Sequence, residues 1–469
     1  MDTKKLRQKI LDLAIHGKLV PQDPNDEPAS VLLERIRAEK ERLIKEGKIK
    51  RSKKSASDTP HYENIDFDVP SSWEIITLSE VFFMHAGKSI SAADISPEPN
   101  EEYRYLCVGG NGKRGYVSSY NTVGAHPIIG RQGALCGNVN YTDGQVYATE
   151  HAVVVDTFCE TEAWWAYYFL KQLNLNQYAT ATAQPGLSVN TIGDVQIPLP
   201  PYKEQVRIVA AIEQWYSLID ALETAKEDLQ ASITQAKSKI LDLAIHGKLV
   251  PQDPNDEPAI ELLKRINPKF TPCDNAHDTN QLPDSWCWST LGDVCSFISG
   301  YSYSSSEYKK AGIPLVRISD INDGIISLDN CAYIQPQGER NVYLQKGDIL
   351  IAMSGATTGK MGIYMNEESA ILNQRVGVVR VTDSKIISEK YRDYFLYRKS
   401  SDILKLAYGG AQPNISGKMI CSLLLPLPPY SEQLRIVTKI EELFAVLDEI
   451  QKSINSSFGC CLGRPLASK

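Results

Sequence analysis

Apolar residues recur at alternating steps of four and three through the middle of the chain. Four such heptads are typical of a coiled coil. They predict one helix from about Glu204 to His246, on the order of 65 Å long at 1.5 Å per residue, that ends at Gly247 and Pro251. The repeating positions are Trp215, Ile219, Leu222, Lys226, Leu229, Ile233, Ala236, Ile240 and Leu243, all apolar except Lys226.

The two ends of the chain carry the same spacing. Tyr430–Ser457 aligns with the start of the central helix, and Asp2–His16 aligns with its end. We therefore expect both ends to pair with the central helix in a circular arrangement, with two antiparallel helical arms and a pseudo-two-fold internal repeat. The corresponding heptad positions are Leu443, Leu447, Ile450 and Ile454, followed by Leu6, Ile10 and Leu13.

One segment, KILDLAIHGKLVPQDPNDEPA, occurs at Lys9–Ala29 and again without a difference at Lys239–Ala259. Packing alone tolerates hydrophobic exchanges of similar size, so 21 identical residues indicate that the two gene segments are kept alike. We interpret them as a recombination site that exchanges the blocks between them. The unmatched tail 458–469 would mark such a junction.

Each half also contains a block that differs between the halves. Strand-like runs at Asp348–Met353, Ala152–Val155 and Val376–Val381, with a helix at Glu162–Leu173, indicate mixed α/β blocks. The predicted fold class is therefore α/β (α+β), with two such domains joined by long antiparallel coiled-coil helices. The predicted parts are an N-terminal helical segment and linker 1–58, a first block 59–198, a central helix 199–260, a linker 261–282, a second block 283–426, a C-terminal helix 427–457 and the tail 458–469.

Composition narrows the class of protein. No apolar run approaches a membrane span and no secretory signal precedes the first helix, so we expect a cytoplasmic protein without membrane contact. Ten cysteines without metal spacing are interpreted as reduced thiols. The net charge is −7, and the first block has 15 acidic and 6 basic residues against 14 and 15 in the second. A basic run, Lys40–Lys54, is interpreted as a solvated helix face.

Three segments imitate two catalytic motifs and lack the residues that the chemistry needs. Leu199–Tyr202 and Leu427–Tyr430 have leucine where an amino-methyltransferase loop has an Asn or Asp that accepts hydrogen bonds from the base. Gly355–Met361 has three residues between its glycines, and a methionine follows Lys360, unlike a phosphate-binding loop. We therefore expect no catalytic residue, no metal site and no cofactor in this chain.

The sequence resembles the specificity subunits of type I restriction–modification systems over nearly its whole length. The resemblance rests on the entrances Pro70–Trp73 and Pro283–Trp286, the exits Pro198–Val209 and Pro426–Val437, the Gly-Ala-x-x-Gly loops, and the duplicated segment. It implies two target-recognition domains, each reading one half of a split double-stranded DNA sequence. It also implies as partners two methyltransferase subunits and the restriction subunits, which would hold S-adenosylmethionine, ATP and magnesium.

Such a chain would read base edges in the major groove, where Gln and Asn suit adenine and Arg or Lys suits guanine. We place the first readers on the Gly-Ala-x-x-Gly loops, because glycine lets the backbone approach DNA closely: Arg131, Gln132, Asn138, Thr357, Thr358 and Lys360. Further candidates are Arg104, Lys113, Arg114, Tyr301, Tyr303, Arg317, Gln374 and Arg375, with Gln184, Asn190, Gln412 and Asn414 before the block exits.

Two alternatives remain open from the sequence. One is a coiled-coil protein scaffold that never binds DNA, and the other is a stand-alone DNA adenine methyltransferase or nuclease. The two blocks differ in sequence while the segments that flank them match, which favours DNA reading over a protein scaffold. The absence of a cofactor-binding loop disfavours the enzyme.

Overall fold

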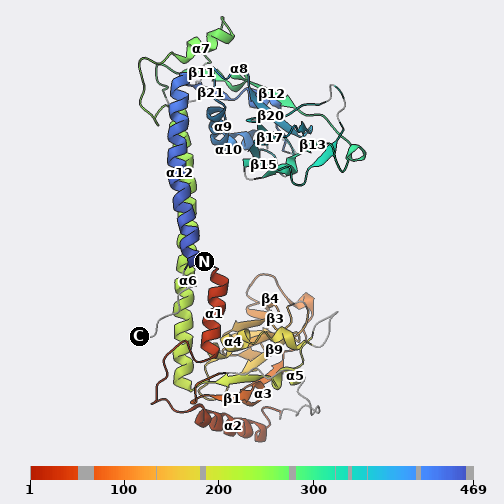
Figure 1. Ribbon diagram of the computed structural model, residues 1–469. Coiled ribbons are helices and arrows are strands. Elements are labelled where there is room, and N and C mark those ends of the chain that lie inside the picture. Colours follow the sequence, from red (N-terminus) through yellow and green to blue (C-terminus); the bar gives the residue numbers. More distant parts are fainter. Residues whose placement is uncertain are drawn as a thin grey trace. The chain divides into compact units, whose positions relative to one another are not determined.

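The computed structural model describes residues 2–50, 68–133, 135–179, 186–273, 281–322, 324–335, 338, 341–355, 357–407 and 413–460. They form two compact units, one that extends to Ala225 and one that comprises Lys226–Cys460. Each unit contains a head of strands and short helices together with part of the long helix α6, which spans Tyr202–Ile245 (Figure 1).

The first head extends from β1 to β10. These two strands pair antiparallel with each other, so the chain enters and leaves the head at one place. Two four-stranded sheets follow the orders β2-β9-β6-β7 and β4-β3-β8-β5, and β3 runs parallel to β8. The elements before α6 are α1 (Thr3–Ile15), α2 (Ala29–Lys45), β1 (Glu74–Thr77), α3 (Leu78–Val81), β2 (Phe83–Ala86), β3 (Tyr105–Gly109), β4 (Gly112–Val117), β5 (Thr122–Val123), β6 (His126–Gly130), β7 (Val139–Thr142), β8 (Gln145–Ala148), β9 (Ala152–Asp156), α4 (Ala163–Gln172), α5 (Val189–Gly193) and β10 (Gln196–Leu199).

The second head extends from β11 to β21, which again pair antiparallel. Its sheets follow the orders β12-β20-β17-β18-β15-β14 and β16-β13-β19. The elements after α6 are α7 (Ala259–Ile266), β11 (Cys287–Thr290), α8 (Leu291–Val294), β12 (Cys295–Ser299), β13 (Ile313–Val316), β14 (Ile321–Asn322), β15 (Gly324–Ile326), β16 (Ala332–Ile334), β17 (Ile349–Ala352), β18 (Met361–Ile363), β19 (Ile371–Leu372), β20 (Val376–Val381), α9 (Glu389–Arg398), α10 (Ser400–Ala407), α11 (Gly417–Cys421), β21 (Leu424–Leu427) and α12 (Tyr430–Cys460).

The two heads share one topology. The order β2-β9-β6-β7 corresponds strand for strand to β12-β20-β17-β18, and β4-β3-β8 corresponds to β16-β13-β19. The pairs β3–β8 and β13–β19 are both parallel, whereas their other neighbours are antiparallel. The predicted mixed α/β fold with an internal repeat is confirmed. The second head differs by adding β15 and β14 at the edge of its larger sheet.

The strands predicted from apolar runs are central strands of the sheets. They are β17, β9 and β20, and Val153, Val154 and Val155 of β9 are completely buried. Strands covered on both faces carry near-continuous apolar runs, which explains why these three were visible in the sequence. The predicted helix at 162–173 is α4.

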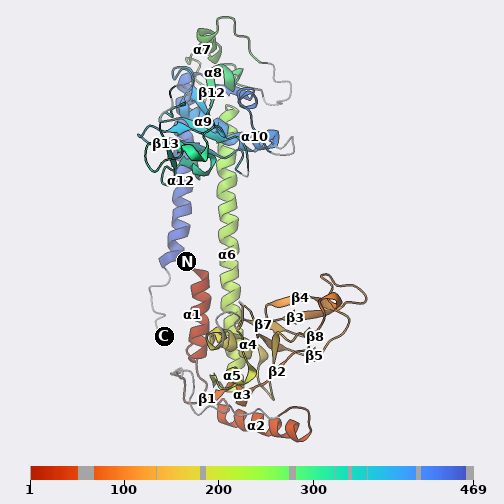
Figure 2. The same cartoon turned by 90° about the vertical axis from the view of Figure 1, so that its right-hand side faces the viewer.

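Helix α6 confirms the predicted central helix, and it pairs with a different chain end in each unit. In the first unit, Arg7 Nη2 of α1 lies 2.5 Å from Asp220 Oδ1, and the Arg7 guanidinium lies 4.9 Å from the centre of the Tyr216 ring. In the second unit, Lys237 Nζ of α6 lies 2.5 Å from Asp448 Oδ1 of α12. Within each unit the two helices run side by side (Figure 2).

The heptad positions are not all covered by the partner helix. Ile219 and Ile233 are buried, whereas Trp215 and Leu222 keep 42% of their surface exposed. A pair of helices covers only one side of each partner, so several of these positions face outward. Leu229 and Ile450 are also exposed, and the half-buried positions are Ile240, Leu243, Leu443, Leu447 and Ile454.

Each helix pair is joined by a third helix from the adjacent head. In the first unit, Tyr168 of α4 packs edge-on against Tyr216 of α6, with ring centres 5.9 Å apart. In the second unit, Tyr394 of α9 packs in the same way against Phe444 of α12, also at 5.9 Å. These contacts tie the heads to the long helices, and the heptad spacing gave no sign of them.

The duplicated segment forms an identical joint in both units. It ends one helix, turns at Gly17 or Gly247 with a positive φ, and packs that glycine against Pro70 or Pro283 at the head entrance. His16 Nδ1 lies 2.8 Å from the Asp12 carbonyl oxygen, and His246 does the same at Asp242 at 2.7 Å. The histidines therefore complete the ends of their helices.

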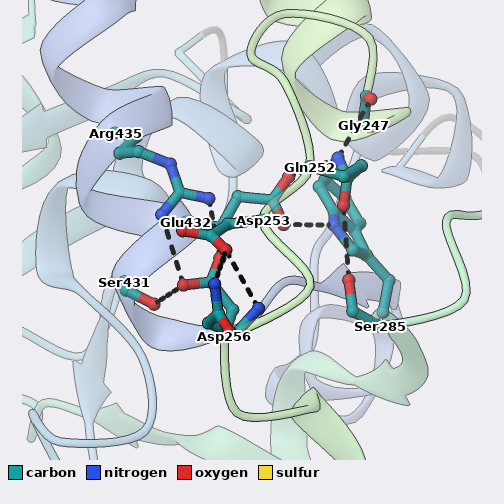
Figure 3. A network of polar contacts seen from close by, with 10 residues as sticks. Gly247, Gln252, Asp253, Asp256, Ser285, Ser431, Glu432 and Arg435 are labelled. Atoms are coloured by element: carbon teal, nitrogen blue, oxygen red, sulfur yellow. Dashed lines mark hydrogen bonds and ion pairs between the residues drawn. The ribbon is translucent and has the colours of Figure 1, made fainter.

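A buried carboxylate stands at the centre of each joint. Glu432 is completely buried and accepts hydrogen bonds from Trp286 Nε1 at 2.9 Å and Gln252 Nε2 at 2.6 Å (Figure 3). Glu204 accepts from Trp73 and Gln22 at the same two distances. Burial raises the pKa of both carboxyl groups, while these donors oppose the shift.

An ion pair completes each joint. Arg435 Nη2 lies 2.7 Å from Asp256 Oδ2 in the second joint (Figure 3), and Arg207 lies at the same distance from Asp26 in the first. The contacts of Gln22 and Asp26, and of Gln252 and Asp256, join the duplicated segment to residues that recur in both halves.

Candidate nucleic-acid interface

A glycine turn follows the corresponding strand in each head. In the first head, the Gly137 amide donates to the Gly130 carbonyl at 2.8 Å and the Cys136 amide donates to Gly133 at 2.9 Å. In the second head, the matching bonds are Gly359 to Ala352 at 2.8 Å and Thr358 to Gly355 at 3.1 Å. All four glycines named in the Gly-Ala-x-x-Gly pattern have φ between 82° and 88°. Because non-glycine residues are strained there, these glycines fix the turn.

A second segment pairs with each turn. Gln132 forms an antiparallel bridge with Gly186, and Ser354 forms the equivalent bridge with Asn414. The Leu187 amide donates to the Arg131 carbonyl at 2.9 Å, and the Ile415 amide donates to Met353 at 2.8 Å. The two segments predicted separately to carry readers therefore lie side by side in both heads.

A third segment, between two strands, completes this edge. The Arg131 amide donates to the His151 carbonyl at 2.9 Å, and the Met353 amide donates to Arg375 at the same distance. His151 lies between β8 and β9, and Arg375 lies between β19 and β20. We call the three segments of each head its glycine-turn edge, which comprises 130–138, 149–151 and 186–187 in the first head and 352–360, 373–375 and 414–415 in the second.

In the first head the edge surrounds an open hollow of about 300 Å³. Arg114, Gln132 and His151 line it together with the backbone of Gly109 and Gly110. Asn111 also lines it. Neither His151 nor Asn111 was predicted from the sequence. Aligning Ala148–Val155 with Leu372–Val379 would have matched His151 to Arg375 and revealed it.

Several predicted readers at this edge, or in the lining of the hollow beside it, are exposed and are not hydrogen-bonded or ion-paired through their side chains to any other described residue. Such groups are free to bind a ligand. They are Arg114, Gln132 and Asn138 in the first head, and Lys360, Gln374 and Arg375 in the second. Tyr301 is exposed, and its carbonyl accepts from the Gln374 amide at 2.8 Å. Asn190 and Asn414 are exposed on the adjoining segment.

Other predicted readers have structural surroundings. Tyr303 is 5% exposed in an apolar cluster with Leu315 and Ile334, so its ring packs inside the second head. Thr358 is buried and its hydroxyl donates to the Gly355 carbonyl at 2.6 Å. Thr357 is half-buried.

Three predicted cations are also placed apart from the free groups. Arg317 Nη2 donates to the Asn330 carbonyl at 3.2 Å, and Lys113 Nζ donates to the Tyr116 hydroxyl at 3.2 Å. Arg104 precedes β3, whose other end reaches the edge. Gln184 and Gln412 lie outside the described residues.

The basic run at Lys40–Lys54 is only partly a solvated face. Lys40 Nζ donates to the Ser79 carbonyl at 2.5 Å and to Phe82 at 3.1 Å. Burial lowers the pKa of Lys40 to about 8. This lysine therefore fastens α2 to the first head, and the residues from Arg51 onward in the run lie outside the described part.

The perturbed histidines of the first head lie at the opposite end of β9 from His151. Asp156 Oδ2 lies 3.3 Å from His85 Nε2, and Asp156 Oδ1 lies 3.0 Å from His126 Nδ1. Burial alone would raise the pKa of Asp156, but the two histidines outweigh it and hold this pKa at about 2. Asp156 raises the pKa of both histidines. This ion-pair cluster joins three strands.

The described part of the chain has neither a cluster of metal-ligand side chains nor a membrane-spanning helix. No three or more His, Cys, Asp or Glu side chains are grouped there to hold a metal ion. No described helix is both long and apolar enough to cross a membrane.

Comparison with known proteins gives one consistent result. The family model described as the Type I restriction modification DNA specificity domain matches residues 70–231 and 283–457. The chain is 28% identical to the Type I restriction enzyme EcoAI specificity subunit of Escherichia coli, over 97% of this chain and 91% of that protein. It is also 28% identical to the EcoEI specificity subunit of Escherichia coli, with the same coverage.

The fold is similar to one solved structure from a study of complex assembly and conformational transition of the type I R-M system. That likeness has a TM-score of 0.55 at 19% identity and covers 83% of this chain and 94% of the other.

Proposed function

The chain belongs to the family of type I restriction–modification DNA specificity subunits, and on this premise we propose that each head reads one half of a split double-stranded DNA sequence. It is a non-catalytic member of its complex. The alternatives of a stand-alone methyltransferase or nuclease, and of a scaffold without a role in DNA recognition, are therefore wrong.

One observation carries the proposal for where DNA binds. The glycine-turn edges have the same backbone hydrogen bonds in both heads but different side chains, Gln132 and Asn138 against Ser354 and Lys360. Two domains that read different half-sequences need the same backbone geometry with different polar side chains. Such groups can pair with base edges in the major groove, where each base pair presents a distinct pattern.

The charge of the chain fits shared DNA binding. Phosphate neutralisation by Lys and Arg supplies much of the affinity of DNA-binding proteins, and a net charge of −7 makes this chain a poor binder alone. Partner subunits would therefore supply much of the phosphate contact, while this chain supplies the contacts to bases.

We further propose two methyltransferase subunits and the restriction subunits as partners. Leu218 and Leu222 of α6 are exposed, and so are Val446 and Ile450, which occupy the same repeat positions on α12. An apolar pattern repeated on both helices fits two copies of one partner. S-adenosylmethionine, ATP and magnesium would be bound by these partners.

The domain boundaries complete the proposal. The target-recognition domains would span residues 59–198 and 283–426, and the helical segments 1–58, 199–260 and 427–457 would serve assembly, with 261–282 as a linker.

The experiment is a selection from randomised DNA duplexes with the chain bound to its methyltransferase subunit. We expect enrichment of a split motif, and we expect no such motif when the chain is omitted. A stable complex that enriches nothing, or a motif that persists without this chain, would contradict the proposed reading of DNA by the heads.

A further inference from the structure

His151 and Arg375 occupy the same place in the two heads. Each follows the strand that runs parallel to β3 or β13, which is β8 or β19, and directly precedes a central strand of the other sheet, β9 or β20. The His151 carbonyl accepts from the Arg131 amide, and the Arg375 carbonyl accepts from the Met353 amide, both at 2.9 Å. Arg131 and Met353 each directly precede the residue that forms the bridge to the second segment. The two side chains therefore leave equivalent points of the same frame.

The backbone at this point is tightly held. The Ala152 amide donates to the Thr149 carbonyl at 2.9 Å, and the Val376 amide donates to Asn373 at 3.0 Å. A Cβ atom at Gly110 would lie only 2.8 Å from the His151 carbonyl oxygen. A side chain on so constrained a backbone is positioned before a ligand binds, which lowers the entropy cost of recognition.

Both side chains are accessible. Arg375 is exposed, and its guanidinium forms no hydrogen bond or ion pair with another described residue. His151 lines the hollow beside Arg114 and Gln132, and its side chain keeps 45% of its surface exposed. Its Nε2 lies 3.4 Å from Glu150 Oε1.

The Glu150 carboxylate beside His151 disfavours a contact with phosphate and favours a contact with a base pair. A phosphate close to His151 would also lie close to Glu150, and like charges repel. A G·C base pair suits both groups, because an imidazole N–H can donate to guanine O6 or N7 while a carboxylate accepts from cytosine N4. Arginine pairs with guanine O6 and N7 through two hydrogen bonds.

From these observations we propose that His151 is a specificity-determining residue that reads a G·C pair in the first half-sequence, as Arg375 does in the second. The inference rests on the proposed function and adds to it a residue and a base pair. Its main consequence is that the two positions are equivalent but lie in different heads, so that a substitution at either one acts on one half-sequence only.

The test removes each side chain in turn, in the full chain with its methyltransferase subunit. His151→Ala should weaken the preference for the G·C pair at one position of the first half-sequence, and Arg375→Ala should do so in the second. Each wild-type preference should weaken by about 5-fold to 150-fold, since a good base contact is worth about 1–3 kcal/mol of discrimination. The other half-sequence should stay unchanged.

Matched controls are Gln145→Ala in the first head and Lys385→Ala in the second. Both residues are exposed and lie at the strand ends opposite their edge, so neither motif should change. His151→Gln, which keeps a polar side chain, provides a second variant should the alanine disturb folding, and it should weaken the preference at the same base pair.

Two results would overturn the inference while leaving the proposed function intact. One is a wild-type split motif that no variant alters. The other is a uniform loss of affinity for all sequences with a salt slope reduced by about one, which marks a phosphate contact. A wild-type complex that selects no split motif would overturn the proposed function and this inference together.

Discussion

Replacing Glu432 by glutamine should weaken one joint and leave its twin intact. The carboxylate is fully buried and both of its oxygens face N–H donors, from Trp286 and Gln252. A glutamine at this position accepts from one donor only, because its own NH2 group meets the other. The NH2 group of the new glutamine and the donor that it meets, from Trp286 or Gln252, are then both left without an acceptor.

The magnitude follows from the bonds that change. A hydrogen bond to a charged group contributes about 1.5–3 kcal/mol, and a buried donor without a partner costs about 1–3 kcal/mol. Removing the buried charge offsets part of this loss, because burial raises the pKa of Glu432 and so disfavours its ionised form. We therefore expect a net destabilisation of the joint of about 1–3 kcal/mol.

Native-state hydrogen exchange measures this locally. The Ala259 amide donates to the Ser285 carbonyl at 2.9 Å across the second joint, and the Ala29 amide donates to Ser72 at 3.0 Å across the first. In Glu432→Gln, exchange at Ala259 should become about 5-fold to 150-fold faster, since 1.4 kcal/mol corresponds to tenfold, while Ala29 keeps its protection. Glu204→Gln should give the reverse pattern.

Either of two results would refute this reasoning. Unchanged protection at Ala259 would mean that the buried carboxylate does not hold the joint. Equal acceleration at Ala29 and Ala259 would mean that the substitution acts on the whole chain.

Three further predictions follow from local geometry. The histidines around Asp156 have raised pKa values. Their contribution to stability is therefore fully present below about pH 6.5 and is lost as the pH rises through their folded-state pKa values. The melting temperature should fall over this pH range, and the fall should be smaller in His85→Asn and His126→Asn. Gly137→Ala should lower stability more than Gly133→Ala, because the new Cβ would lie 2.3 Å from the Asn176 nitrogen at Gly137 and meets nothing within 4 Å at Gly133; positive φ alone costs about 1–2 kcal/mol, and equal denaturation midpoints would contradict the packing argument. Leu218→Asp and Val446→Asp should each remove one methyltransferase subunit from the complex without changing the melting temperature of the free chain, as native mass spectrometry would show; retention of both subunits would exclude this docking face.

The sequence predicted features that depend on local pattern or on duplication. Helix α6 followed from heptad spacing, and β9, β17 and β20 followed from apolar runs that are buried on both faces. The correspondence of the halves followed from aligning them. Each of these features is encoded by residues close together in the chain or by direct repetition.

The rest depends on contacts between distant segments. The apolar residues of α4 did not reveal that Tyr168 packs on Tyr216, since an aromatic residue on a helix fits many partners. Tyr303 was predicted as an exposed reader, although a tyrosine at that position is equally suited to the apolar cluster in which it lies. His151 was not placed beside the glycine turn from the sequence, because its position there depends on the order of the strands in the sheet.

The identical joints carry a consequence for protein design. The principal contacts between each joint and its head are made by residues that both heads possess, Pro70, Ser72 and Trp73 or Pro283, Ser285 and Trp286, so an exchanged head brings these interface residues with it. A chain built with the second head in both places would need no new interface residue at either joint. It would specify a target in which one half-sequence is written twice, and a library of interchangeable heads would yield as many targets as there are ordered pairs.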